Sequence, residues 1–177
     1  MASRVAHLVG RFLGSLRSGG PPSVISSWAE SQLLPAEVAA WRSMSGQDRR
    51  HAAGVARRVE DTLGERATRP VLAAALLHDV GKAEVGLGTF GRVVATLAAG
   101  LVGRERASGW STGRSAGPRF LGRIGRYLRH PDLGGDLLER AGSDRLTVAW
   151  AREHHVPRHR WSVPVAVGDV LKAADDD

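Results

Sequence analysis

The chain has 177 residues, of which 42% are hydrophobic and 24% charged, a balance that suits one globular domain and argues against wholesale disorder. It contains no cysteine, which excludes disulfides, thiolate metal sites and a cysteine nucleophile, and its net charge of +7 is compatible with anionic partners. Only 5% of the residues are aromatic, and Ala, Leu, Gly and Arg outnumber β-branched residues, so we expect an all-α fold rather than a β-sandwich.

The first elements expected along the chain are a short amphipathic helix and a linker. Apolar residues from Val5 to Leu16 repeat at helical spacing among three arginines, and the Gly-Gly-Pro-Pro run at 19–22 ends this helix. The pattern lacks the unbroken apolar core of a signal peptide, so we expect a cytoplasmic protein. Residues 1–17 can pack on the domain, which we favour, or make peripheral contact with a membrane surface. The sequence thus divides into an N-terminal segment, 1–22, and a domain, 23–177.

The domain is predicted to consist of helices separated by glycine and proline. A helical region from Val24 to Trp41 is interrupted near Pro35. Further helices are expected at about 47–63, 71–80, 92–101, 119–128, 131–140, 143–155 and 164–174. The helix at 71–80 is apolar on all sides, which indicates a buried central helix that ends at Gly81, and Ser143 is a candidate N-cap. Residues 86–119 are rich in glycine and arginine, and we expect them to form an insertion with a mobile loop.

Four side chains that can bind a metal lie on apolar helical faces. His51, His78, His154 and Asp175 each share such a face with apolar residues three or four positions away. These faces point toward the core, and a buried imidazole or carboxylate without a partner costs several kcal/mol. One shared divalent cation would satisfy all four side chains, because imidazole and carboxylate are suitable ligands for Mn, Fe, Zn or Ni.

Each of these residues also has an ordinary structural explanation when it is taken singly. His51 could be a hydrogen-bonded core histidine, and Asp175 could be a solvated acid in a run of three aspartates. The pair His154-His155 could be a polar helix end, where a cationic histidine is favoured. His130, which precedes a proline, could be a loop residue. The metal hypothesis therefore depends on their coincidence with a further motif.

That motif is the segment Leu76–Lys82, which reads Leu-Leu-His-Asp-Val-Gly-Lys. With His51 upstream and Asp175 downstream, the chain resembles the HD-domain superfamily of metal-dependent phosphohydrolases over about residues 45–177. The resemblance implies a single HD-type helical bundle. It also implies that one metal ion is held by His51, His78, Asp79 and Asp175.

A second set of histidines resembles a branch of this superfamily that has two metal sites. His130 begins a His-Pro-x-x-Gly segment that ends at Gly134, and His154-His155 resembles the paired histidines that follow it. By this resemblance, Asp79 bridges two ions, and the second ion is held by His130, His154 and His155. The Gly-Tyr-Pro motif of the cyclic-di-GMP-degrading branch is absent after His155, which argues against that substrate.

The resemblance implies hydrolysis of a nucleotide or another phosphate ester, with one or two divalent ions of Mn, Fe, Zn, Ni or Co as cofactor. The catalytic residues would be Asp79, which bridges ions that activate water, and Lys82, which holds a phosphate oxygen. The alternative for Lys82 is a solvated cation at a helix end. Among the arginines after residue 103, Arg126 and Arg129 are candidates for binding substrate phosphate, although a solvated surface loop explains this segment slightly better.

Three other functions compete with the phosphohydrolase. The first is a non-catalytic or regulatory HD domain that acts as an interaction module, and the complete ligand set argues against it. The second is an arginine-rich binder of nucleic acid or a membrane surface. Residues 1–129 do carry 19 basic and 9 acidic side chains, against 6 and 9 in residues 130–177, but the basic residues are scattered rather than in one block. The third is a metal-dependent oxygenase of the same fold, and Lys82 favours phosphate over it.

Overall fold

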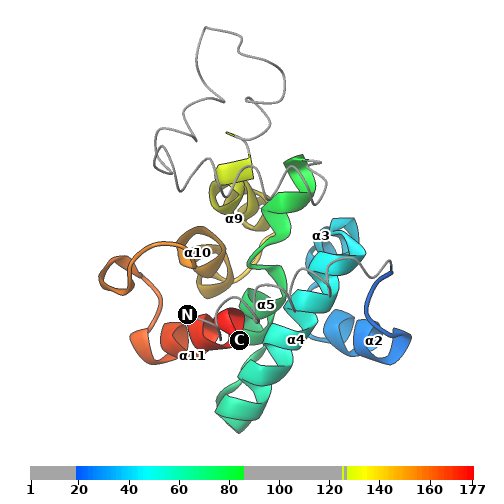
Figure 1. Ribbon diagram of the computed structural model, residues 1–177, viewed down its shortest axis with the longest axis horizontal. Helices are drawn as coiled ribbons and strands as arrows, with labels where there is room; N and C mark the ends of the chain where they lie inside the picture. The colour runs from blue at the N-terminus through cyan, green and yellow to red at the C-terminus, as the bar shows by residue number, and fades with distance from the viewer. Residues whose placement is uncertain (1–18, 86–124, 126) are drawn as a thin grey trace, which may run out of the picture.

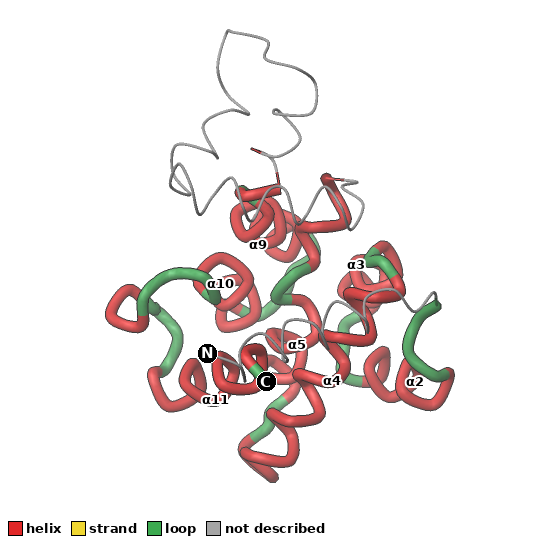
Figure 2. The backbone as a smooth tube through the Cα atoms, in the orientation of Figure 1, coloured by secondary structure: helices red, strands yellow, loops and turns green. Residues whose placement is uncertain are grey.

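The computed structural model describes residues 19–85, 125 and 127–177, and this part of the chain forms helices and loops without a β-strand (Figure 2). The predicted all-α fold is therefore confirmed for these residues. The predicted amphipathic helix at 1–17, the insertion at 86–119 and its helix at 92–101 lie outside the described residues. Of the helix predicted at 119–128, residues 125, 127 and 128 are described, and they are helical.

The helical elements follow the predicted order along the chain. The α-helices are α2 (Ser23–Ser31), α3 (Pro35–Ser43), α4 (Gly46–Leu63), α5 (Arg69–Leu77), α9 (His130–Arg140), α10 (Arg145–Glu153) and α11 (Val165–Asp176). Short 3₁₀ helices are η1 (Gly64–Arg66), η2 (Val80–Val85) and η4 (Arg158–Arg160).

Helix α5 lies at the centre of the bundle (Figure 1). Every side chain from Val71 to Leu77 is buried, as the apolar sequence of this helix predicts. Helices α4 and α10 pack against α5, α11 packs against α4, and α9 packs against α10 and η2. Each fully buried leucine contributes about 1.5–3 kcal/mol to folding, so the residue that follows α5 is held in a well-packed core.

Local signals set most helix ends. Ser45 caps α4, because its hydroxyl accepts a hydrogen bond from the backbone N–H of Asp48 at 3.1 Å. Gly64 ends the same helix with a φ of 54°, a conformation that favours glycine. Proline stands in the first turn of α3, α5 and α9, where its missing N–H has no intrahelical acceptor.

Two predicted helix ends are wrong. Helix α5 ends at Leu77, and the chain turns through His78 and Asp79 into η2, so Gly81 lies inside a helical element and does not terminate one. Gly81 is required there because η2 meets the backbone of α9 too closely for a side chain. At α10 the N-cap is Asp144 and not Ser143, since the Asp144 carboxylate accepts from the N–H of Leu146 at 2.8 Å.

Among the described ranges, no helix combines the length and the apolar composition needed to cross a bilayer.

Candidate metal centre

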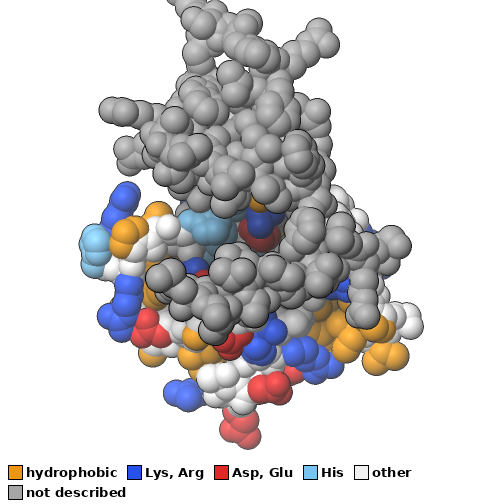
Figure 3. Space-filling model, viewed as in Figure 1, with side chains coloured by type: hydrophobic (Ala, Val, Ile, Leu, Met, Phe, Trp, Pro, Cys, Tyr) orange, Lys and Arg blue, Asp and Glu red, His pale blue; other side chains and the backbone are white. Residues whose placement is uncertain are grey.

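The structure brings the histidines and acids of the predicted site to one end of α5. His78 and Asp79 follow the last residue of α5, and His51 is in the second turn of α4. The other members come from helix ends that surround this point. His130 begins α9, His154 and His155 follow α10, and Asp175 is in the last turn of α11. Histidine side chains gather beside acidic and basic atoms on one face of the molecule (Figure 3).

One group of ligand atoms surrounds the carboxylate of Asp175. Its Oδ1 lies 2.9 Å from Nε2 of His51 and 3.5 Å from Nε2 of His78. Nε2 of His78 also lies 3.4 Å from Oδ2 of Asp79. His51, His78 and Asp79 each offer a ligand atom within 4.8 Å of the others, so this group could hold a metal ion, with Asp175 beside it.

A second group surrounds the other oxygen of Asp79. Its Oδ1 lies 3.2 Å from Nε2 of His130 and 3.6 Å from Nε2 of His154. His155 completes a set of four side chains with ligand atoms within 4.8 Å of one another, and it is the exposed member of that set. Asp79 therefore belongs to both groups and presents one oxygen to each.

The histidines of the core are oriented by the backbone. Nδ1–H of His78 donates to the carbonyl oxygen of Ala75 at 2.9 Å, that of His130 to Tyr127 at 2.7 Å, and that of His154 to Ala151 at 3.0 Å. Each acceptor is three residues before its histidine, at the carboxyl end of a helical stretch, where carbonyl groups lack intrahelical donors. These bonds place one ring proton on Nδ1 and turn each Nε2 toward Asp79.

The atoms that face one another in this centre have no hydrogen-bond partner within the described residues. They are Nε2 of His78, Nε2 of His130, Nε2 of His154 and Oδ1 of Asp79, and all four are buried. The lone pairs on Nε2 of His130 and of His154 converge on Oδ1 of Asp79. In a buried site such lone pairs repel one another and cost free energy unless a cation lies between them. The donor set of imidazole and carboxylate therefore fits a divalent transition-metal ion.

Electrostatics in the centre favour charged carboxylates. Burial by itself raises the pKa of Asp79, but the ammonium of Lys82 and the neighbouring His78 outweigh it and hold the pKa well below its usual range. Burial by itself raises the pKa of Asp175, but the neighbouring His51 and His78 outweigh it, and the net shift is downward. Both acids are therefore carboxylates at neutral pH, as metal ligands must be.

The buried histidines differ in charge. Burial lowers the pKa of His130 to about 4, and burial followed by the nearby charge of His78 lowers that of His154. Both imidazoles are therefore neutral at pH 7. Burial also acts to lower the pKa of His78, but Asp79 and Asp175 outweigh it and raise the value to about 10. A proton on His78 thus occupies the position that a metal ion would take.

Lys82 pairs with Asp79. Its ammonium contacts Oδ2 of that carboxylate, and this charge raises the pKa of Lys82 despite burial. The side chain of Lys82 is 17% exposed. Of the two arginines predicted to bind substrate, Arg129 is exposed one residue before α9, and Arg126 lies outside the described residues.

Sequence reasoning missed how closely two glycines bring the backbones together. Gly81 of η2 and Gly134 of α9 face one another, and a Cβ on Gly134 would lie 3.1 Å from the nitrogen of Gly81. This approach places His130 beside Asp79. The spacing of His-Pro-x-x-Gly contains the signal, because His130 and Gly134 lie one helical turn apart on one face of α9. The backbone acceptors three residues before the histidines were also missed.

Comparisons of the chain with protein-family models, with curated proteins and with solved structures find no match.

Proposed function

We propose that this protein is a metal-dependent phosphohydrolase or phosphodiesterase of the HD-domain type. Its substrate would be a small phosphorylated molecule, a nucleotide or another phosphate ester. The order of His51, His78-Asp79 and Asp175 along the chain supports the superfamily, and their convergence at the end of α5 supports a shared metal centre.

The observation that carries the proposal is the set of four buried atoms without hydrogen-bond partners, together with the backbone bonds that orient the three histidines. A core histidine with a purely structural role would use both ring nitrogens in hydrogen bonds. In His78, His130 and His154, Nδ1 is hydrogen-bonded to a backbone carbonyl, whereas Nε2 has no hydrogen-bond partner within the described residues. This is the arrangement of metal-binding histidines, in which the second nitrogen fixes the orientation of the ring.

The residues divide into two ligand sets that share Asp79. The first set comprises His51, His78, Asp79 and Asp175, and the second comprises Asp79, His130, His154 and His155. A divalent ion bound there would lower the pKa of a water and neutralise charge on a phosphate oxygen. Lys82 would orient Asp79 through their ion pair and present its remaining donors to a phosphate.

The test begins with the metal content of the purified protein. After loading with Mn, Fe, Zn, Ni or Co and removal of free ions, we expect one or two ions per chain, and an Asp79→Ala variant should lose them. His159→Ala is the matched control, because His159 is an exposed histidine of η4 outside the centre. A wild-type protein that binds no ion at neutral pH would overturn the proposal.

The activity is tested on the loaded protein with p-nitrophenyl phosphate, bis-p-nitrophenyl phosphate and a panel of nucleotides. Hydrolysis that requires the ion and is lost in Lys82→Met as well as Asp79→Ala supports a phosphohydrolase. Metal binding without hydrolysis of any ester would instead favour the non-catalytic HD domain.

A further inference from the structure

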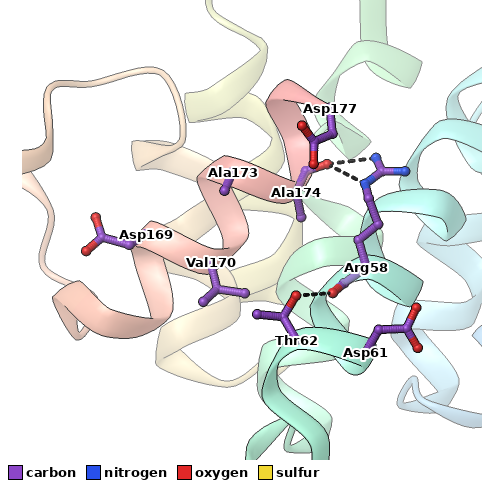
Figure 4. Close-up of a pocket in the computed structure, with 8 residues that line it drawn as sticks. All are labelled: Arg58, Asp61, Thr62, Asp169, Val170, Ala173, Ala174 and Asp177. Carbon is purple, nitrogen blue, oxygen red and sulfur yellow. Dashed lines mark hydrogen bonds between the residues drawn. The ribbon is translucent and has the colours of Figure 1, made fainter.

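Helix α4 holds the last turn of α11 through Arg58. The guanidinium of Arg58 donates two hydrogen bonds to one backbone oxygen, the carbonyl of Ala174, with Nε at 3.0 Å and Nη2 at 2.7 Å (Figure 4). Carbonyl groups in the last turn of a helix lack intrahelical donors, and a cation there also interacts favourably with the helix dipole. The contact therefore joins the last turn of α11 to α4.

The residue that follows Ala174 is the metal-ligand candidate Asp175. Its carboxylate must stay 2.9 Å from His51 and 3.5 Å from His78 to remain in the first ligand set. Loss of the last turn of α11 would move this side chain away without any change to the ligands themselves. The position of Asp175 therefore depends on what holds its backbone.

His51 and Arg58 act from the same side of α4. They are seven residues apart, which is about two turns of helix, so both side chains leave the same face. His51 contacts the carboxylate of Asp175, and Arg58 contacts the carbonyl one residue earlier. Two consecutive residues of α11, Ala174 and Asp175, are thus contacted by two residues that lie two turns apart on one face of α4.

We propose that Arg58 is a positioning residue of the metal centre, which keeps Asp175 in place for the first metal ion. The inference rests on the proposed function. It assigns a role in metal affinity to a side chain that is not itself a ligand.

The chain offers a matched set of variants. Arg58 lines an open pocket of about 400 Å³ between α4 and α11 (Figure 4). Arg58→Gln removes the charge and the paired donors, and Arg58→Lys keeps the charge and one donor. Arg57→Gln is the control, because Arg57 is on the same helix but contacts Glu60 at 2.8 Å and the ring of Trp28.

Zinc affinity and stoichiometry are measured for each full-length variant by competition with a chromophoric chelator. We expect Arg58→Gln to weaken the binding of one Zn²⁺ by about 10-fold, as loss of a ligand-orienting contact does in other metal sites. Arg58→Lys should recover part of this affinity, and Arg57→Gln should match the wild type. Equal affinity in Arg58→Gln and Arg57→Gln, or a lower melting temperature with unchanged affinity, would overturn the role of Arg58.

Hydrogen exchange of the ion-free protein separates this inference from the metal centre itself. If Arg58 holds the last turn of α11, the amides near Asp175 should exchange about 10-fold faster in Arg58→Gln than in Arg57→Gln. Faster exchange together with a wild-type protein that binds no Zn²⁺ would refute the metal centre while leaving the contact with Ala174 in place. Unchanged exchange would refute the contact, whatever the wild type binds.

Discussion

Replacement of Gly81 with alanine tests whether the close approach of η2 and α9 builds the centre. An alanine Cβ at this position would overlap the carbonyl oxygen of His130 and lie 2.6 Å from the backbone nitrogen of Gly134. Both atoms belong to the backbone of α9. Relief of the overlap therefore requires the two elements to separate, because no side chain can rotate away.

We expect Gly81→Ala to lower the free energy of unfolding by about 2–3 kcal/mol, a cost typical of overpacking. For a chain of this size that corresponds to a fall in melting temperature of roughly 5–10 °C. His130 begins α9 and Asp79 precedes η2, so the same separation lengthens the 3.2 Å distance between Nε2 and Oδ1. Metal affinity of the second ligand set should fall by about 10-fold or more.

The assays are urea denaturation and Zn²⁺ titration of the full chain. Gly54→Ala is the control, since Gly54 is in α4 and a Cβ there would lie 3.4 Å from the flexible side chain of Arg58. This substitution should stabilise the helix by about 0.5–1 kcal/mol, which makes it a control for the denaturation assay. If Gly81→Ala retained the stability and the metal affinity of the wild type, the reasoning about η2 and α9 would be refuted.

The remaining predictions concern the core and the ion. Glu37 is fully buried and accepts a hydrogen bond from the N–H of Leu34 at 2.7 Å, so Glu37→Ala should cost about 2 kcal/mol in urea denaturation; an unchanged midpoint would contradict this. Zn²⁺ at 100 times its dissociation constant should stabilise the wild type by about 2.7 kcal/mol, and calorimetry should show no such shift for Asp79→Ala. Because the pKa of His78 is about 10 without an ion, Zn²⁺ binding at pH 7 should displace its proton and weaken as pH falls. Titration calorimetry in two buffers of different ionisation enthalpy measures that proton, and equal heats in both would rule out its release.

Much of the helical framework follows from local sequence. The apolar composition of residues 71–77 predicts a buried helix, and the structure confirms it, because a segment that is apolar on every side can only be stable in the core. Pro35 and Gly64 mark helix ends for conformational reasons that act within one turn of the chain. The prediction for Gly81 is wrong because its close contact with α9, which is distant in sequence, determines its role. The prediction for Ser143 is wrong because the neighbouring residue, Asp144, caps α10 instead.

The candidate site, like the fold, follows partly from the sequence and partly from the tertiary structure. The order and the residue types of His51, His78, Asp79 and Asp175 are properties of the sequence, and they already pointed to a metal. How Asp79 presents one oxygen to each group is a matter of tertiary structure, since it depends on the packing of α9 against η2. The apolar face of the helix already distinguished His154 from its neighbour His155, and the structure buries His154 and leaves His155 exposed.

By itself, the sequence determined that this chain forms helices and that particular imidazoles and carboxylates lie on their inner faces, because periodicity and capping are local. Only the tertiary structure decided which atoms meet. The contact of Asp79 with His130 and the two bonds from Arg58 to Ala174 join elements whose relative positions no local rule specifies. Interatomic distances in the centre depend on the packing of several helices at once, and a change of about 1 Å in that packing is enough to make or break a ligand set.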